Sequence, residues 1–223
     1  MKRTKLKDRI LPDYTKGEEI FNMVSHIVGG AFGIAALACC VAKAILHRNG
    51  FAVAGGAVFG TTMVLLYTMS SVYHGLRTEM AKKIFQVIDH CTIYFLIAGS
   101  YTPIIITRLR ESNPKVAWWL LGIVWAISIL AIVLTAIDLN KFKVFSMICY
   151  LGIGWSVIFA IKPLLAAYPP AFIAWLIGGG VSYTVGSILY GLGRKVRYMH
   201  STFHLFVLLG SVLHFIGILI YCM

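Results

Sequence analysis

The feature that most constrains this chain is a series of long apolar stretches, each near the length that crosses a bilayer as a helix. A helix needs about 20 mainly apolar residues to span the hydrocarbon core. Seven stretches meet this requirement, and they cover residues 20–46, 51–75, 84–107, 116–137, 144–161, 171–191 and 199–221. Backbone groups in lipid must be hydrogen-bonded within the segment. The sequence therefore predicts an all-α, seven-transmembrane helix bundle.

Composition and loop length agree with this prediction. Hydrophobic residues make up 59% of the 223 residues and charged residues only 13%, and the mean hydropathy is +0.84. These values lie far from those of soluble domains. The first stretch is too long for a signal-peptide core and is expected to belong to the mature protein. We expect one domain over residues 1–223 with a basic leader at 1–19, and short loops that make successive helices antiparallel neighbours.

The net charge of +12 is explained by membrane topology and not by nucleic acid. Six Lys and Arg residues lie in the leader, and three, two and three lie in the second, fourth and sixth loops, whereas the opposite side carries six in all. Positively charged loops stay in the cytoplasm. We therefore predict a multi-pass protein of the cell (inner or cytoplasmic) membrane with a cytoplasmic N-terminus and an outside C-terminus, and the bilayer as its partner.

Few ionisable residues lie within the spans, and each marks a candidate site because such groups usually face the bundle interior. The candidates are His26, His74, Asp89, His90, His200, His204 and His214. Since alternate spans run in opposite directions, the end of the second span and the starts of the first, third and seventh share the cytoplasmic side. His26, His74, Asp89, His200 and His204 are therefore expected at one depth.

The segment "HSTFH" (200–204) places two imidazoles one helical turn apart on one face, which lets both bind one ion. His74 from another helix would be a third ligand. Zinc on three histidines keeps one position open for water, whose pKa then falls to about 7. Imidazole ligands favour zinc over magnesium or calcium. We therefore predict a Zn²⁺ site at His74, His200 and His204.

Asp89 and Ser70 are the candidate catalytic residues beside this site. Asp89 is interpreted as a group that accepts a hydrogen bond from the zinc-bound water and carries its proton; the alternative is a carboxylate that extends to water. Ser70 lies one turn before His74 and would orient its imidazole or bind a substrate carbonyl, or else bond its own helix backbone. The role of His26 is left open: its side chain either contacts one of the metal ligands as a supporting partner or only packs.

The two remaining histidines are not expected to bind the ion. His90 is turned by about 100° from Asp89 on a helix, so both are not expected to face the centre. His90 is therefore interpreted as a packing residue or as one side of an interhelical hydrogen bond. His214 lies about 15 Å beyond His204 along the helix axis, which is too far for the same ion.

Small residues and helix ends have simpler interpretations. The glycine-rich runs at 29–33, 55–60 and 178–180 are expected to let helix backbones approach closely. The five cysteines show no metal or disulfide spacing and are expected to be packing residues. Glu79 and Asp138 lie at cytoplasmic helix ends and are expected to be solvated.

Four motifs together resemble the progestin and adipoQ receptor (PAQR) family, and more closely its bacterial branch, the haemolysin III-type membrane proteins. These motifs are "EEIFNMVSH" (18–26), "SSVYH" (70–74), "DHCTIYFLIAGSYTP" (89–103) and "HSTFHLFVLLGSVLHF" (200–215). The resemblance covers nearly the whole chain. It implies a seven-helix bundle with zinc near the cytoplasmic face on His74, His200 and His204, and with Ser70 and Asp89 beside the metal-bound water.

The resemblance and the site lead to three functional hypotheses. The first is a zinc-dependent hydrolase of a lipid amide or ester bond, because the family resembles alkaline ceramidases in this site; a membrane lipid would be its substrate or ligand. The second is a non-enzymatic sensor or regulator of membrane homeostasis with a structural zinc. A pore-forming cytolysin is disfavoured, because seven spans with short loops describe a resident membrane protein. These patterns leave the lipid and the oligomeric state open.

Overall fold

A computed structural model describes residues 3–193 and 195–223 of the chain. It contains seven helices that are long and apolar enough to cross a membrane, as predicted, and no strand within the described part. The seven segments are Lys16–Leu46 (α1), Gly50–Gly75 (α2), Glu79–Ser112, Pro114–Ile137 (α5), Lys143–Ala167, Pro170–Leu192 (α8) and Met199–Tyr221 (α9). The third segment consists of α3 (Glu79–Ile104), η2 (Ile105–Leu109) and α4 (Arg110–Ser112). The fifth consists of α6 (Lys143–Gly154), η3 (Ser156–Ala160) and α7 (Ile161–Ala167).

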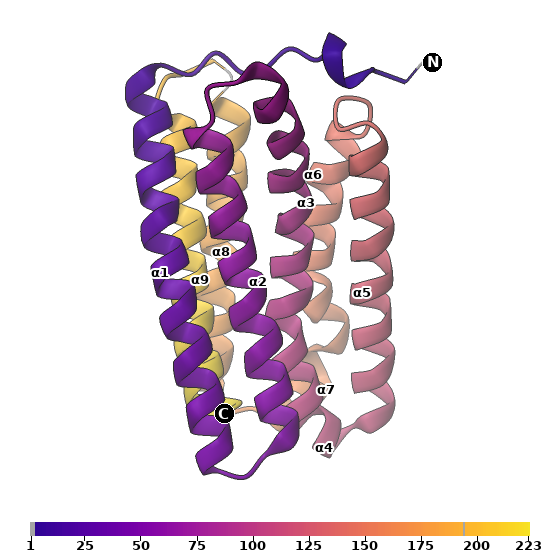
Figure 1. The fold of residues 1–223 in the computed structure, drawn as a ribbon. Coiled ribbons are helices and arrows are strands. Elements are labelled where there is room, and N and C mark those ends of the chain that lie inside the picture. The colour runs from indigo at the N-terminus through magenta and orange to yellow at the C-terminus, as the bar shows by residue number, and fades with distance from the viewer. Residues whose placement is uncertain (1–2, 194) are drawn as a thin grey trace.

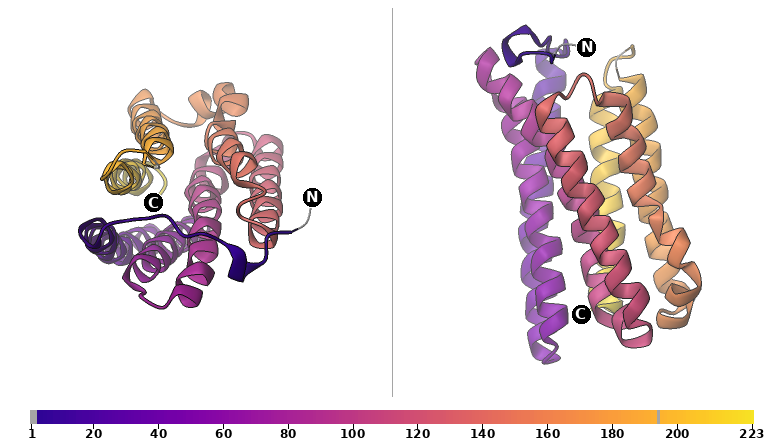
Figure 2. Two further views of the ribbon diagram at one scale, coloured as in Figure 1. Left: turned by 90° about the horizontal axis from the view of Figure 1, so that it is seen from above. Right: turned by 90° about the vertical axis from the view of Figure 1, so that its right-hand side faces the viewer.

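Successive segments pack as antiparallel neighbours, and α9 closes the bundle against α1 (Figure 1). In the view from above, α3 lies in the middle with the other helices around it (Figure 2, left). Its apolar window is 78% buried, against at most 50% in the other six segments. The N-terminal leader and the C-terminus lie at opposite ends of the bundle. Residues on α3 can therefore contact several helices at once.

Polar caps set where the helices begin. Thr15 and Glu18 form a capping box at the start of α1, in which each side chain bonds the backbone N–H of the other. The Asn49 side chain caps α2, and the Asn113 side chain caps α5 just before Pro114. These residues satisfy N–H groups that would otherwise be unpaired near the membrane surface.

Two segments are irregular within the bundle. Pro103 is followed by the π-helix Ile105–Leu109 (η2), in which Thr107 has a non-helical backbone (φ −96°, ψ −114°). The fifth segment passes from α6 through the 3₁₀ helix Ser156–Ala160 (η3) to α7, Ile161–Ala167. Tyr101 supports this break, because its hydroxyl donates to the carbonyl of Ile153 at 3.0 Å and accepts from a backbone N–H beyond it. Irregular backbone at membrane depth needs such partners.

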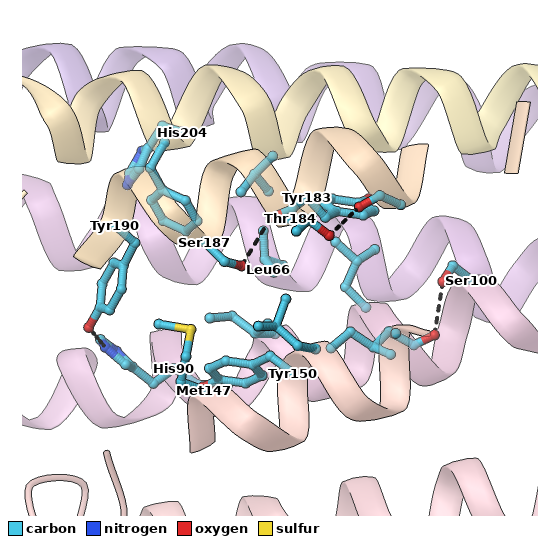
Figure 3. Close-up of a pocket in the computed structure, with 18 of the residues that line it drawn as sticks. Leu66, His90, Ser100, Met147, Tyr150, Tyr183, Thr184, Ser187, Tyr190 and His204 are labelled. Carbon is cyan, nitrogen blue, oxygen red and sulfur yellow. Dashed lines mark hydrogen bonds between the residues drawn. The ribbon is translucent and has the colours of Figure 1, made fainter. Parts of the chain in front are cut away.

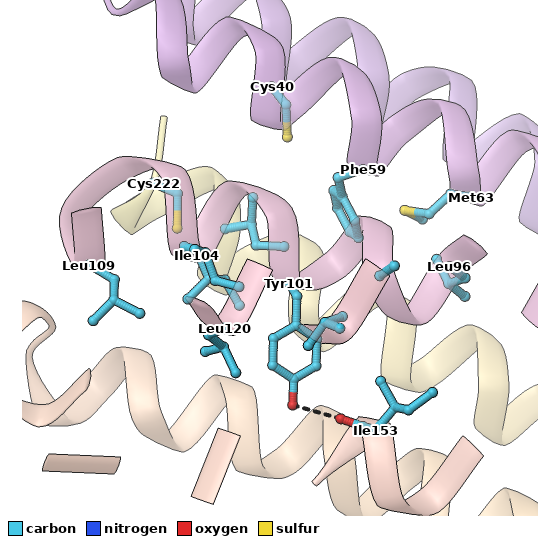
Figure 4. Packing of buried hydrophobic residues seen from close by; sticks show 14 of the residues in the cluster. Cys40, Phe59, Met63, Leu96, Tyr101, Ile104, Leu109, Leu120, Ile153 and Cys222 are labelled. Atoms are coloured by element: carbon cyan, nitrogen blue, oxygen red, sulfur yellow. Dashed lines mark hydrogen bonds between the residues drawn. The ribbon is translucent and has the colours of Figure 1, made fainter. Parts of the chain in front are cut away.

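The core near the C-terminal end of the bundle is built from close helix contacts and apolar side chains, among them Phe59, Met63 and Tyr101 (Figure 4). Glycines of α2 contribute as predicted: a Cβ on Gly60 would lie 2.5 Å from the Cα of Leu37 in α1. All five cysteines are free, and three of them are buried. Small residues thus let α1 and α2 approach to backbone contact.

The leader is folded across the end of the bundle, over the start of α3 and the end of α5 (Figures 1 and 2). The Lys83 ammonium donates to the carbonyl of Lys7 at 2.9 Å, and the guanidinium of Arg9 donates to the Gln86 side chain at 3.0 Å. Arg9 is only 5% exposed. Residues 3–15 therefore form a strap on the bundle, anchored by Arg9 and by the Lys7 carbonyl.

One expectation for the helix ends is wrong. Asp138 is buried, and its carboxylate accepts hydrogen bonds from the backbone N–H of Thr4 at 2.7 Å and of Lys141 at 3.0 Å. The physical reason is that the leader meets the end of α5, where the backbone N–H of Thr4 donates to this carboxylate. Glu79 remains exposed as expected and pairs with Lys83 at 2.6 Å.

Candidate metal centre

Three histidines from two helices meet at the leader end of the bundle. His74 lies near the end of α2, and His200 and His204 lie in the first two turns of α9. One ring nitrogen from each of the three lies within 4.8 Å of the other two, and all three residues are buried. The Nε2 atoms of His200 and His204 are 3.1 Å apart. The structure thus brings together three of the five residues that the sequence assigned to one depth.

The protonation pattern of this cluster fits a cation. His74 Nδ1 lies 2.7 Å from the Glu19 carboxylate, so Nδ1 carries the proton and Nε2 keeps a lone pair. That Nε2 is buried without a hydrogen-bond partner. The Nε2 atoms of His200 and His204 face each other, and one ion can satisfy both lone pairs. Three buried imidazoles of this kind are a donor set that can hold a divalent metal.

Glu19 is a functional residue that the sequence interpretation missed. Its Oε2 accepts from His74, while its Oε1 accepts from the Lys82 ammonium at 2.6 Å. A carboxylate that holds the far nitrogen of a metal-binding histidine fixes the ring and its tautomer. The available signal was a pair of acidic residues, Glu18 and Glu19, directly before the apolar part of the first span, at the depth of the histidines.

His26 contacts the cluster by ring stacking. Its ring lies over that of His204, with centroids 3.7 Å apart and planes 17° from parallel. The rings of Tyr67 and His26 meet edge to face, with centroids 5.0 Å apart and planes at 83°. Both His26 ring nitrogens are buried without a hydrogen-bond partner. Of the two roles left open, the structure thus shows packing against His204.

Tyr14 brings the leader onto the cluster. Its ring stacks on His200 at 4.8 Å and 22°, and lies 5.8 Å from the ring of His74. Burial, together with nearby phenols and carboxylates, raises the pKa of the Tyr14 hydroxyl well above its ordinary value. The phenol therefore stays protonated and covers the histidines from the leader side. The sequence interpretation counted only the basic charge of this leader.

Asp89 and Ser70 lie together in the wall of a cavity that reaches the histidines. The Ser70 hydroxyl faces the Asp89 carboxylate, and both side chains share the cavity wall with His200 and His204. Ser70 is 2% exposed, and the Asp89 side chain is 15% exposed. The two candidate catalytic residues are thus adjacent to each other, and they share the cavity with two of the three clustered histidines.

His90 makes the interhelical hydrogen bond that the sequence suggested. Its Nδ1 is 2.7 Å from the carbonyl of Gln86, and its Nε2 is 3.2 Å from the hydroxyl of Tyr190 on α8. The expectation that Asp89 and His90 would not both face the interior is wrong, because both line the cavity. The reason is the central position of α3, which exposes a wide arc of its surface to the interior.

The cavity is long and mainly apolar, with a volume of about 130 Å³. Its lining runs along α3 from Asp89 to Tyr101, a distance of about 18 Å on a helix. Figure 3 shows His204, Tyr190 and His90 at one end and Ser100 at the other. Most of the wall is apolar and includes Leu66, Ile93, Leu96, Ile97, Met147, Leu151, Phe203 and Val207. This shape and lining suit an extended hydrocarbon chain.

Similarity to known proteins extends along most of the chain. The model of the "Haemolysin-III related" family matches residues 14–215. "Hemolysin-3" of Bacillus cereus is 37% identical over 204 residues, which cover 92% of this chain and 91% of that protein. The "Hemolysin-3 homolog" of Bacillus subtilis (strain 168) is 35% identical over 209 residues, or 94% and 96% of the two chains. The human "Monocyte to macrophage differentiation factor" is 26% identical over 188 residues, or 80% and 76%.

Proposed function

The chain belongs to the haemolysin-III-related family of membrane proteins, and we propose that it is a zinc-dependent hydrolase of a lipid amide or ester bond, acting at the cytoplasmic side of the membrane. One observation carries this proposal. Three buried imidazoles have converging nitrogens, and two of them, His200 and His204, line a long apolar cavity together with the Asp89 carboxylate. That arrangement joins a metal site, a proton carrier and a binding site for a hydrocarbon chain.

His74, His200 and His204 would hold the metal. When bound, zinc supplies a Lewis acid that polarises a carbonyl group and lowers the pKa of water at its remaining position. Glu19 keeps the proton of His74 on Nδ1 and so directs the Nε2 lone pair to the site. The Glu19 charge is balanced by Lys82, so that the carboxylate stays ionised near the membrane.

Asp89 would move the proton during hydrolysis. Its carboxylate would accept a proton from the attacking water and return it to the nitrogen or oxygen of the leaving group, as the single bond between that atom and the carbonyl carbon breaks. The Ser70 hydroxyl, which faces this carboxylate, fixes its direction. The apolar cavity holds the acyl chain and excludes bulk water from the reacting groups.

The test is the release of fatty acid from a panel of N-acyl amides and lipid esters by the purified protein. We expect turnover to stop with a chelator, to return with zinc, and to fall by about 10²- to 10⁴-fold in Asp89→Asn. Ser70→Ala should reduce it as well, whereas Ser71→Ala is the matched control, since the Ser71 hydroxyl only bonds the Thr68 carbonyl. Turnover that survives both chelation and Asp89→Asn contradicts the proposal.

A regulator with a structural metal is the second candidate. Its support is that the cluster ties α2 to α9 and that Tyr14 ties the leader to the cluster. It predicts that His74→Ala lowers the unfolding temperature as much as chelation does, because metal binding contributes to folding. Full thermal stability of His74→Ala, together with loss of lipid turnover, would favour the enzyme.

A further inference from the structure

A further buried histidine, His214, lines the same cavity, far from the His74, His200 and His204 cluster. His214 follows His204 by ten residues on α9, which is about 15 Å along the helix. It is 8% exposed and lines the cavity. Its Nε2 lies 3.2 Å from the backbone carbonyl of Leu176 on α8. Because a carbonyl only accepts, Nε2 carries the ring proton and Nδ1 is left with a lone pair.

The position of this ring is fixed by α8. A Cβ on Gly179 would overlap the Nε2 and Cδ2 atoms of the ring, so this edge of the imidazole rests directly on the backbone of α8. The opposite edge, which carries Nδ1, is therefore turned away from Gly179. Tyr183 holds the ring from the side, with centroids 5.3 Å apart and planes at 77°. The glycine run at 178–180 thus leaves room for the His214 imidazole as well as for close packing of α8 against α9.

Nδ1 of His214 is buried without a hydrogen-bond partner. The hydroxyl groups described in the same half of the cavity are already paired within the protein. Tyr183 bonds Ser211 at 2.9 Å, and the Thr184 and Ser100 hydroxyls donate to backbone carbonyls (Figure 3). An unpaired buried acceptor destabilises a protein. Isolated polar groups in apolar pockets commonly set ligand orientation and specificity.

We propose that His214 Nδ1 accepts a hydrogen bond from a hydroxyl group carried in the middle of the lipid's acyl chain. The cavity then prefers a hydroxylated acyl chain to a plain one of the same length. This inference rests on the proposed function, which places the carbonyl of the lipid at the histidine cluster. The hydroxyl would lie about 15 Å away, at the depth of His214. Apolar side chains hold the chain between the two groups.

The test uses fatty-acid binding, which needs no turnover. Ricinoleate and oleate differ by one mid-chain hydroxyl, and each would compete with a fluorescent fatty acid for the purified protein. We expect ricinoleate to bind about 5- to 10-fold more tightly, the effect of one hydrogen bond of about 1 kcal/mol. A fatty acid with its hydroxyl beside the carboxylate should bind no better than its plain counterpart. Equal affinities for ricinoleate and oleate overturn the proposal.

Variants of His214 assign the preference to its ring. His214→Phe removes the acceptor and should bring the ricinoleate-to-oleate ratio to about one, whereas His214→Asn keeps an acceptor near Nδ1 and should retain part of the preference. A preference that persists in His214→Phe overturns the proposal. The failure of the proposed function is distinct: selective binding without hydrolysis of any lipid removes the hydrolase, and hydrolysis without selectivity removes only the role of His214.

Discussion

Glu19 connects the cluster of three histidines to the positive charge of Lys82. Its two carboxylate oxygens hold His74 on one side and Lys82 on the other, at 2.7 and 2.6 Å. The His74 side chain has no exposed surface, so no water can replace this contact. The orientation of His74 thus depends on a residue of the preceding helix, 55 positions away in sequence.

We expect Glu19→Gln to lower the zinc affinity by about 10- to 100-fold, because a neutral amide holds the Nδ1 proton of His74 less strongly. Zinc affinity would be measured by competition with a chromophoric chelator. Glu79→Gln is the matched control, since Glu79 pairs with Lys83 on the exposed surface. Equal affinity of Glu19→Gln and the wild type would show that Glu19 does not orient His74.

The stacked pair of His26 and His204 allows two similar substitutions to be compared. His26→Phe keeps a flat ring on His204 and removes nitrogens that bond nothing, so the metal content is expected to remain that of the wild type. His204→Phe removes a ligand and is expected to abolish tight binding. Elemental analysis of both purified variants checks this. Loss of metal from His26→Phe would make His26 a ligand.

At the scale of helices, the contact between α1 and α2 depends on residues without side chains. Gly60 packs against the Cα of Leu37. A Cβ added to Gly33 would lie 3.1 Å from the backbone nitrogen of Val64. In lipid, helices gain little from burying apolar surface, so close backbone packing supplies much of their association. This contact also positions Glu19 on α1 against His74 on α2.

Gly60→Ala is therefore expected to destabilise the bundle by about 1–3 kcal/mol, the usual effect of overpacking a close contact. Gly122→Ala is the control. A Cβ on Gly122 meets nothing within 4 Å, so alanine should be neutral or stabilise α5 by up to about 1 kcal/mol. Unfolding midpoints in detergent measure both. A Gly60→Ala midpoint equal to that of Gly122→Ala would contradict the packing role.

At the scale of the whole molecule, the leader closes the end of the bundle that holds the metal cluster. It is fixed at Asp138 near its start and at Gln86 further along, and Tyr14 at its end stacks on His200. Burial alone would raise the pKa of the Asp138 carboxyl, but the backbone N–H donors of Thr4 and Lys141 lower it below its ordinary value. Asp138 therefore holds the leader as an ionised group.

A carboxyl group whose pKa is lowered by folding stabilises the folded protein at pH values above its unfolded pKa, which is about 3.9 for Asp. This stabilisation is lost as the pH falls through the lowered pKa of the folded state. We expect Asp138→Asn to increase hydrogen exchange of residues 3–9 at neutral pH. The wild type should show the same change only in acid, after correction for intrinsic rates. Asp13→Asn, at an exposed position of the leader, is the control. Unchanged exchange in Asp138→Asn would contradict the anchoring role.

Orientation in the membrane is a further prediction at this scale. The leader and the even-numbered loops carry most of the positive charge, so the end with the histidines should face the cytoplasm. A fluorescent protein that folds only in the cytoplasm should be active when fused to the N-terminus. Alkaline phosphatase, which needs export, should be active at the C-terminus. The reverse pattern would place the candidate site outside.

Sequence by itself determined the seven spans, their alternating direction and the histidines that share a depth. The reason is that the length of an apolar helix and its direction across the bilayer fix the depth of every residue in it. His74, His200 and His204 could therefore be grouped without knowledge of their neighbours. The local turn of α9 also placed the last two on one face.

Only the tertiary structure decided which side chains meet at that depth. The lateral order of the helices and their rotation depend on many small packing contacts, such as Gly60 on Leu37, which no single segment encodes. Those contacts brought Glu19 to His74, placed α3 in the centre so that Asp89 and His90 face one cavity, and seated Asp138 under the leader. Depth is a property of one helix in the bilayer, whereas a contact requires two.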